Sequence, residues 1–526
     1  MKSKRLIIRI ESLLNKTPNI GLLIIGGIVL VMIASAIVSS FTGQLTYVSI
    51  DPDTLEKQQN IFEVKNYLIP ENFMNFISKG LYNYSSLGSA VTILVIVIAF
   101  GIAEKSGFIY TILKKLLFNV PKNIVTIILV FVGILSNVSS IVELNAGYLF
   151  LLPLSAFIYM GNGRNPLAGI ATMFAAIFAG YNINILLTNH ALFLNDITTA
   201  VVNTTLPNYV IQGSDNRFIM GALIILSTFL ITVITEKYIV NILPVYDLEV
   251  YTYHRITDYE KRGLFVAIIY SIVSIIAYIY FLVPKNVIDL PGSGLLLGNY
   301  NPVTTSYLTQ LIRSPLFVNF AIHISYYFII AGTLYGIFSK KFSSLNEVMK
   351  SAVVSIADNA EYFVLAFLLS QFIFIMYDSN LSLYILLKLV AIIPTSGSLL
   401  GMAVALFIVT AIINLIIPTS VTKWAIIAPI VLPAFVGSLV NPLFAQTIFQ
   451  LGDSATNTIS ILMPYTIFAY VLFNIYAKKT KQHCGNGTYF KLTFPYSMAL
   501  TGLYFIVIVI WVVLNIGLGP NVPLFI

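Results

Sequence analysis

Charged residues are scarce in this chain: Asp, Glu, Lys and Arg together supply only 10% of its 526 residues. Hydrophobic residues supply 58%, and the mean hydropathy is +0.90. A soluble globular protein of this length needs more polar residues to cover its surface. The composition therefore excludes a soluble globular protein. The sequence predicts a polytopic protein of the cell membrane, which we expect to be all-α.

Cysteine and histidine are also rare. The single cysteine, Cys484, excludes an intramolecular disulfide and a cysteine-based metal cluster. The four histidines are scattered, and no HExxH or paired-carboxylate motif accompanies them, which argues against a membrane-embedded enzyme. No Walker A signature occurs, so ATP-driven transport would need a partner subunit. We expect no cofactor.

The net charge of +8 indicates topology and not nucleic-acid binding, because Lys and Arg form short clusters between apolar segments. These clusters place the N-terminus and the basic loops in the cytoplasm. A short outer helix is expected near residues 71–80, and an interfacial amphipathic helix after Lys105. The apolar segments are residues 21–41, 87–103, 124–135, 218–234, 264–283, 316–338, 362–376, 381–393, 399–417 and 496–516.

The stretch from Asn414 to Pro464 combines membrane-grade hydrophobicity with a dense polar cluster. Its apolar part is interrupted by four prolines and flanked by hydroxyl, amide and carboxyl side chains. Broken helices beside such side chains predict a solute site inside the bilayer. An earlier stretch, Ser136 to Leu186, repeats this order of features, with Pro153 matching Pro429 and Asn165-Pro166 matching Asn441-Pro442 at one common offset.

Paired interrupted segments predict a secondary transporter built from two inverted repeats, which we place at about residues 87–240 and 361–477 of a single domain. A membrane-embedded enzyme and an ion channel are the alternatives from other classes. Channels need a continuous polar pathway, whereas two inverted broken stretches suit alternating access around one central site.

Several motifs make the chain resemble the AbgT family, the p-aminobenzoyl-glutamate transporters. They are AGYLFLLPLSAFIY and GRNPLAG in the first stretch, TKWAIIAPIVLPAF, LGDS and MPY in the second, and GTYFKLTFPY near the C-terminus. The resemblance implies about nine transmembrane helices plus two re-entrant hairpins, and a homodimer. It also implies cation-driven movement of small aromatic-amide or carboxylate compounds, including export of sulfonamide-type drugs.

The chain departs from the family pattern at three charged positions. Related sequences carry an acid where this chain has Asn145, an Asp where it has His190, and an Arg where it has Gln450. These changes remove groups that the resemblance links to proton coupling and to pairing with an anionic substrate. Sodium therefore stays open beside the proton as the coupling ion.

Asp453 is the strongest candidate for ion coupling, because an ionisable group at this depth is costly unless it faces water or a partner. Ser454 follows it directly. His190 has two interpretations, a proton relay and a hydrogen-bonded structural histidine. Glu143 is a candidate replacement for the missing acid. A sodium site from Asp453, Asn457 and Thr419 is a further hypothesis, because hard cations need several oxygen ligands.

Neutral hydrogen-bonding side chains and one aromatic residue supply the candidate substrate site. Trp424 is one of only two tryptophans and is a candidate for stacking on an aromatic ring. Lys423 either pairs with a carboxylate or snorkels to the interface. Individual hydroxyls and amides can instead cap helix ends. The full candidate set is Asn137, Ser139, Asn182, Asn184, Thr419, Ser420, Lys423, Trp424, Gln450 and Asn457.

Overall fold

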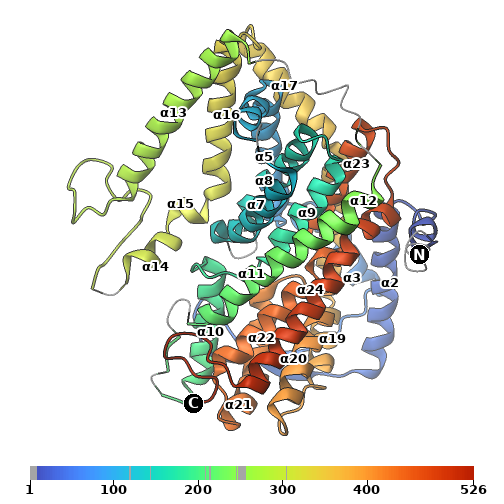
Figure 1. Cartoon of the computed structure of the whole chain (residues 1–526). Coiled ribbons are helices and arrows are strands. Elements are labelled where there is room, and N and C mark those ends of the chain that lie inside the picture. The colour runs from blue at the N-terminus through green and yellow to red at the C-terminus, as the bar shows by residue number, and fades with distance from the viewer. Residues whose placement is uncertain are drawn as a thin grey trace.

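The computed structural model describes residues 9–117, 120–141, 144–207, 209–211, 215–244, 246, 256–303 and 305–526 (Figure 1). Within these residues, nine helical segments are long and apolar enough to cross a membrane. Strands occur there only as two short antiparallel pairs and isolated bridges. The structure confirms the helical, polytopic fold class that the composition predicts.

Long helices form at most of the apolar segments. Asn19 caps the first of them by accepting a hydrogen bond from the Gly21 backbone N–H at 2.8 Å, and a Thr257–Glu260 capping box begins α13. The long helices are α2 (Ile20–Phe41), α5 (Gly88–Lys105), α11 (Arg217–Ile234), which continues through a π-helical turn into α12 (Val240–Ile242), α13 (Asp258–Leu282), α16 (Phe320–Phe338), α18 (Ala360–Asp378) and α24 (Asn486–Leu514).

Shorter elements connect them. The expected outer helix is α3 (Pro70–Ser78), and the expected amphipathic helix is α6 (Phe108–Leu117). The remaining connecting elements are β1 (Leu45–Ile50), β2 (Lys57–Phe62), α4 (Gly80–Ser85), β3 (Ser140–Ile141), β4 (Leu144–Asn145), α14 (Tyr307–Ile312), α15 (Pro315–Val318), α17 (Leu345–Asp358) and α19 (Leu381–Val390).

Some apolar segments form helices that are shorter than a membrane span. Within residues 381–393, for example, α19 has only 10 residues. At 1.5 Å per residue it is about 15 Å long, roughly half of the hydrocarbon core. The helix ends before Pro394 in the PTSGS sequence, because a proline disfavours helical backbone in the residue before it.

The two broken stretches consist of short helices separated by polar breaks. The first contains α7 (Lys122–Leu135), α8 (Ala146–Gly161), α9 (Pro166–Ala179) and α10 (Asn189–Val202). The second contains α20 (Leu399–Ile413), α21 (Ser420–Gly437), α22 (Pro442–Ala455) and α23 (Pro464–Lys479). In Figure 1, α7, α8 and α9 lie in the upper half of the molecule, and α20, α21 and α22 lie in the lower half.

Local structure at the matched positions is the same in both stretches. Pro153 lies inside α8, and Pro429 lies inside α21. Asn165 caps α9 through a 3.0 Å bond from the Leu167 N–H, and Asn441 caps α22 through a 3.1 Å bond from the Leu443 N–H. An Asn cap followed by Pro at the first helical position sets the helix start in each case.

Candidate functional site

A buried ion pair lies where the breaks of the two stretches meet. Asp453 is in the last turn of α22, and Lys423 is in the first turn of α21. The Lys423 ammonium donates to Asp453 Oδ1, and both side chains are fully buried. Lys423 therefore does not snorkel, and its carboxylate partner in this structure is Asp453.

Both stretches hold the Asp453 carboxylate. Asn182, in the break between α9 and α10, donates to Asp453 Oδ2 at 2.8 Å. Ser420, the first residue of α21, donates to the same oxygen. Each carboxylate oxygen thus has a donor, as a buried charge requires.

Asn414 connects the two halves of the second break, and sequence reasoning did not select it. Its Oδ1 accepts from the Lys423 ammonium at 2.6 Å. Its Nδ2 donates to the Asp453 backbone carbonyl at 2.7 Å and to Asn457 Oδ1 at 2.6 Å. The available signal was its place as the first polar residue after α20, directly before the Pro418 break.

Both charges lie at helix ends that disfavour them. Lys423 is near the N-terminus of α21, where exposed N–H groups give a partial positive charge, and Asp453 is near the C-terminus of α22, where the partial charge is negative. Each charge therefore depends on the other. Removing one partner of a buried pair typically costs about 3–5 kcal/mol, because the other charge stays buried without compensation.

His190 contacts this site through Asn182. Because Asn182 Nδ2 faces Asp453, its Oδ1 faces His190 Nε2 at 2.9 Å, so Nε2 carries the proton and donates. His190 is buried, and its ring lies 5.1 Å from that of Tyr181. It orients the amide that binds Asp453 and does not touch the carboxylate itself.

A small polar cavity lies beside His190 and Asn182. It has a volume of about 20 Å³ and is lined in part by Asn184 and Gln450. His190 Nδ1 and Gln450 Oε1 are buried and have no hydrogen-bond partner among the described residues. A space of this size holds about one water molecule.

Trp424 lies in the core and is fully buried. Its indole N–H donates to Thr198 Oγ1 at 2.8 Å, and its ring lies 4.7 Å from that of Phe449. Thr198 in turn donates to Gln446 Oε1 at 2.6 Å. Sequence reasoning did not select Thr198 or Gln446, because no local pattern distinguishes either of them from the other polar residues of its helix.

The other predicted residues are dispersed around the pair. Asn137 Nδ2 donates to the Ile177 carbonyl at 2.9 Å, and Asn184 Oδ1 accepts from the Leu186 N–H at 3.1 Å. Ser454 is buried beside Asp453, and its hydroxyl has no partner among the described residues. Glu143 and the side chain of Ser139 lie outside the described part of the chain.

The candidate sodium ligands are each bonded to protein groups in this structure. Thr419 bonds to the Tyr377 hydroxyl at 3.1 Å, and Asn457 Oδ1 accepts from Asn414. The ammonium of Lys423 occupies Asp453 Oδ1. No group of three or more His, Cys, Asp or Glu side chains that could hold a metal ion occurs in the described residues.

A buried acid–base pair at the ends of interrupted helices, inside a bundle of membrane-length helices, is typical of a membrane transport protein. The sequence profile of the AbgT putative transporter family matches residues 5–526. The chain belongs to this family, and the resemblance carried by its motifs is confirmed. It is a multi-pass membrane transporter.

Individual proteins are similar to this chain over nearly its whole length. The chain is 25% identical over 520 residues to the p-aminobenzoyl-glutamate transport protein of Escherichia coli (strain K12), covering 98% of this chain and 96% of that protein. It resembles the structure of MtrF of Neisseria gonorrhoeae, described as illuminating a class of antimetabolite efflux pumps, with a TM-score of 0.50, 28% identity and coverage of 98% and 100%. The crystal structure of the YdaH transporter of Alcanivorax borkumensis is similar with a TM-score of 0.48 and 25% identity, and the match covers 96% of this chain and 100% of that one.

Proposed function

We propose that this chain is a secondary active transporter that moves a small aromatic-amide or carboxylate compound against its gradient, coupled to H⁺ or Na⁺. The buried Lys423–Asp453 pair carries the proposal, because donors from both broken stretches meet on its carboxylate. The names of the relatives, a p-aminobenzoyl-glutamate transport protein and a pump of antimetabolites, support this substrate class.

In this proposal, Asp453 receives the coupling cation and Lys423 is the charge that the cation displaces. With H⁺ or Na⁺ at Asp453, the Lys423 ammonium loses its counter-charge and becomes available to a substrate carboxylate. The remaining polar candidates around the pair bind the substrate or hold the breaks open. Coupling then follows from charge balance, because a buried lone charge is expensive at every step.

The proposed architecture has two re-entrant hairpins, one in each broken stretch, pointing in opposite directions within repeats 87–240 and 361–477. Supporting contacts lie at the two helix turns. Arg164, before α9, bonds to Glu236 beside the basic loop after α11, and Asn441, before α22, bonds to the Pro523 carbonyl in the C-terminal tail. We also propose a homodimer, to which the well-exposed α13 contributes.

Cysteine labelling tests this topology. In a Cys484→Ser background, a cysteine at Lys341 or Lys479 is expected to react only from the cytoplasmic side, and one at Asn299 only from outside. The measurement is modification by an impermeant maleimide in right-side-out and inverted vesicles. Reaction of all three from the same side would overturn the inverted arrangement and the cytoplasmic N-terminus.

Gradient-driven uptake tests coupling. Proteoliposomes containing the wild-type protein and p-aminobenzoyl-glutamate are given a Na⁺ gradient at equal pH, or a pH gradient without Na⁺, each applied inward for a symporter and outward for an antiporter, with the membrane potential clamped. We expect accumulation above equilibrium with one of the two gradients and none in the Asp453→Asn variant. Equilibration without accumulation under both gradients would contradict secondary active transport.

A further inference from the structure

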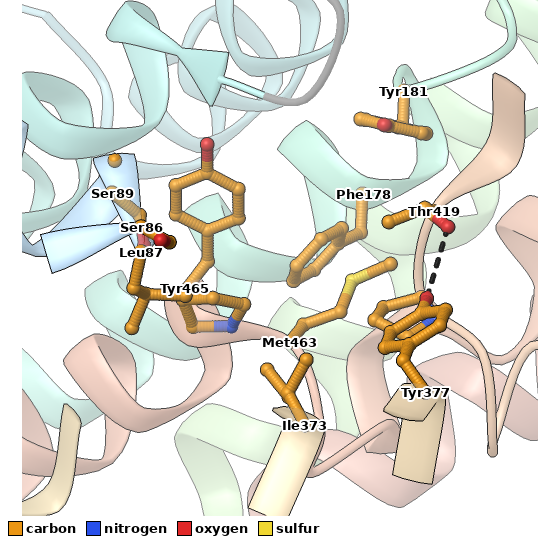
Figure 2. Close-up of a pocket in the computed structure, with 13 residues that line it drawn as sticks. Ser86, Leu87, Ser89, Phe178, Tyr181, Ile373, Tyr377, Thr419, Met463 and Tyr465 are labelled. Atoms are coloured by element: carbon orange, nitrogen blue, oxygen red, sulfur yellow. Dashed lines mark hydrogen bonds between the residues drawn. The ribbon is translucent and has the colours of Figure 1, made fainter. Parts of the chain in front are cut away.

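A second cavity lies beside the ion pair and contains none of its charged groups. It has a volume of about 330 Å³ and lies between α5, α9, α18, the break before α21 and the start of α23 (Figure 2). Figure 2 shows Phe178 and Met463 at its centre, with Tyr465 on one side and Tyr377 on the other. None of the described residues that line it is charged.

We infer that this cavity binds the uncharged aromatic ring of the transported compound, an inference that rests on the function proposed above. Aromatic and thioether side chains favour a planar ring as a neighbour, through edge-to-face, stacked and sulfur–aromatic contacts. The volume is at the lower end of the about 300–1,000 Å³ of small-molecule sites, which suits one substituted ring.

Hydroxyl groups in the wall suit the polar substituents of such a ring. Ser86, Ser89 and Thr419 line the cavity, and Thr419 and the Tyr377 hydroxyl are bonded to each other at 3.1 Å. Neutral hydroxyls can donate to an amide carbonyl and accept from an aromatic amine. A carboxylate would find no positive partner among the lining residues, so the charged end of the compound must lie elsewhere.

Chain continuity joins the cavity to the ion pair. Thr419 directly precedes Ser420, and Tyr181, which also lines the cavity, directly precedes Asn182. Ser420 and Asn182 are the two donors to Asp453 Oδ2. A ring bound in this cavity therefore lies next to the backbone that positions both donors.

Binding measurements on the full-length protein in lipid nanodiscs test the inference. The probes are radiolabelled p-aminobenzoyl-glutamate and two unlabelled competitors, 4-aminobenzamide for the uncharged ring and glutamate for the charged end. We expect 4-aminobenzamide to compete better than glutamate. Tyr377→Leu, which removes one ring from the wall, is expected to raise the Kd of the labelled probe about tenfold.

Matched variants separate ring contacts from folding defects. Tyr377→Phe keeps the ring and loses only the bond to Thr419, so its Kd should rise much less than that of Tyr377→Leu. Gly88 also lines the cavity, and no heavy atom other than those of its chain neighbours and its own helix backbone lies within 4 Å of a Cβ added there. Gly88→Phe should therefore fill the space and abolish competition by 4-aminobenzamide, whereas Gly88→Ala should have a smaller effect.

The outcomes distinguish this inference from the proposed function. Wild-type affinity in both Tyr377→Leu and Gly88→Phe would overturn the ring site, while loss of gradient-driven uptake in Asp453→Asn would still support coupled transport. Absence of saturable binding of either aromatic probe to the wild-type protein would overturn the aromatic class of ligand itself. Wild-type uptake in Asp453→Asn would remove the function on which the inference rests.

Discussion

The two broken stretches share their local structure but differ in chemistry. At the meeting point, the first contributes neutral groups, the amide of Asn182 and, behind it, His190. The second contributes both charges, Lys423 and Asp453. A repeated backbone pattern therefore supports an asymmetric site, in which one stretch carries the ion pair and the other holds its carboxylate.

The turns of the two stretches also differ in charge, but here the first stretch is the charged one. Before α9, Arg164 binds both carboxylate oxygens of Glu236 at 2.6 and 2.9 Å. Before α22, Asn441 accepts from the Tyr209 hydroxyl at 2.8 Å, and no charged side chain is among its hydrogen-bond partners in the described residues. The first stretch thus has its charge at the turn, and the second has its charge at the break.

The largest expected effect comes from neutralising the charged break. Asp453→Asn should abolish gradient-driven uptake and lower stability by about 3–5 kcal/mol, because Lys423 stays buried without a counter-charge. Uptake into proteoliposomes measures the first effect. Reaction of Cys484 with a thiol-sensitive dye during heating measures the second.

The double variant Lys423→Met with Asp453→Leu is the control for this prediction. It removes both charges together and should recover much of the lost thermal stability, because no charge remains to be compensated. It should not recover uptake. Wild-type uptake rates in Asp453→Asn would remove the functional difference between the two breaks.

A smaller loss of stability is expected from substitutions at the turns before α9 and α22. The two turns should differ in how that loss depends on salt. Arg164→Ala should lower stability by about 2 kcal/mol, because it removes a bidentate bond to a charged group. The Arg164 and Glu236 side chains are 12% and 24% exposed, so 1 M NaCl should reduce that loss. Asn441→Ala should lower stability by an amount that salt does not change. Equal salt responses in melting experiments would show that the turns do not differ in charge.

The smallest effect is expected at His190. His190→Gln keeps an N–H donor for Asn182 Oδ1, so uptake should fall by less than about threefold, within the range of one neutral hydrogen bond. Uptake measured between pH 5.5 and 8.5 should keep its wild-type pH dependence. A loss above about tenfold together with a flat pH profile would favour the proton relay and give the first break a chemical role of its own.

Much of the fold could be predicted because lipid imposes strong local constraints. Long apolar runs became α2, α13 and α24, since an uncharged segment of that length forms a helix in a bilayer. Proline and the Asn-Pro pairs located the breaks, because Pro removes a backbone donor and Asn caps the next helix. Asp453 could be selected because few acids occur at that depth.

The hydrogen-bond partners could not be predicted in this way. Asn182 and Asp453 are 271 residues apart, and no local pattern relates an amide on one stretch to a carboxylate on the other. Lys423 had two equally good interpretations until packing buried it against Asp453. Trp424 was expected at a substrate, and its placement against Phe449 and Thr198 depends on how α10, α21 and α22 pack.

The sequence by itself therefore determined the class of protein, the membrane-length helices, the two interrupted stretches and the candidate acid, Asp453. These follow from hydropathy, backbone chemistry and motifs, which act over a few turns of helix. The tertiary structure decided that Lys423 is the partner of Asp453, that Asn414 joins the halves of the second break, and that an uncharged aromatic cavity lies beside them. Such contacts depend on the relative position of helices distant in sequence, because hydrogen bonds and ion pairs form only when side chains come within about 3 Å of each other.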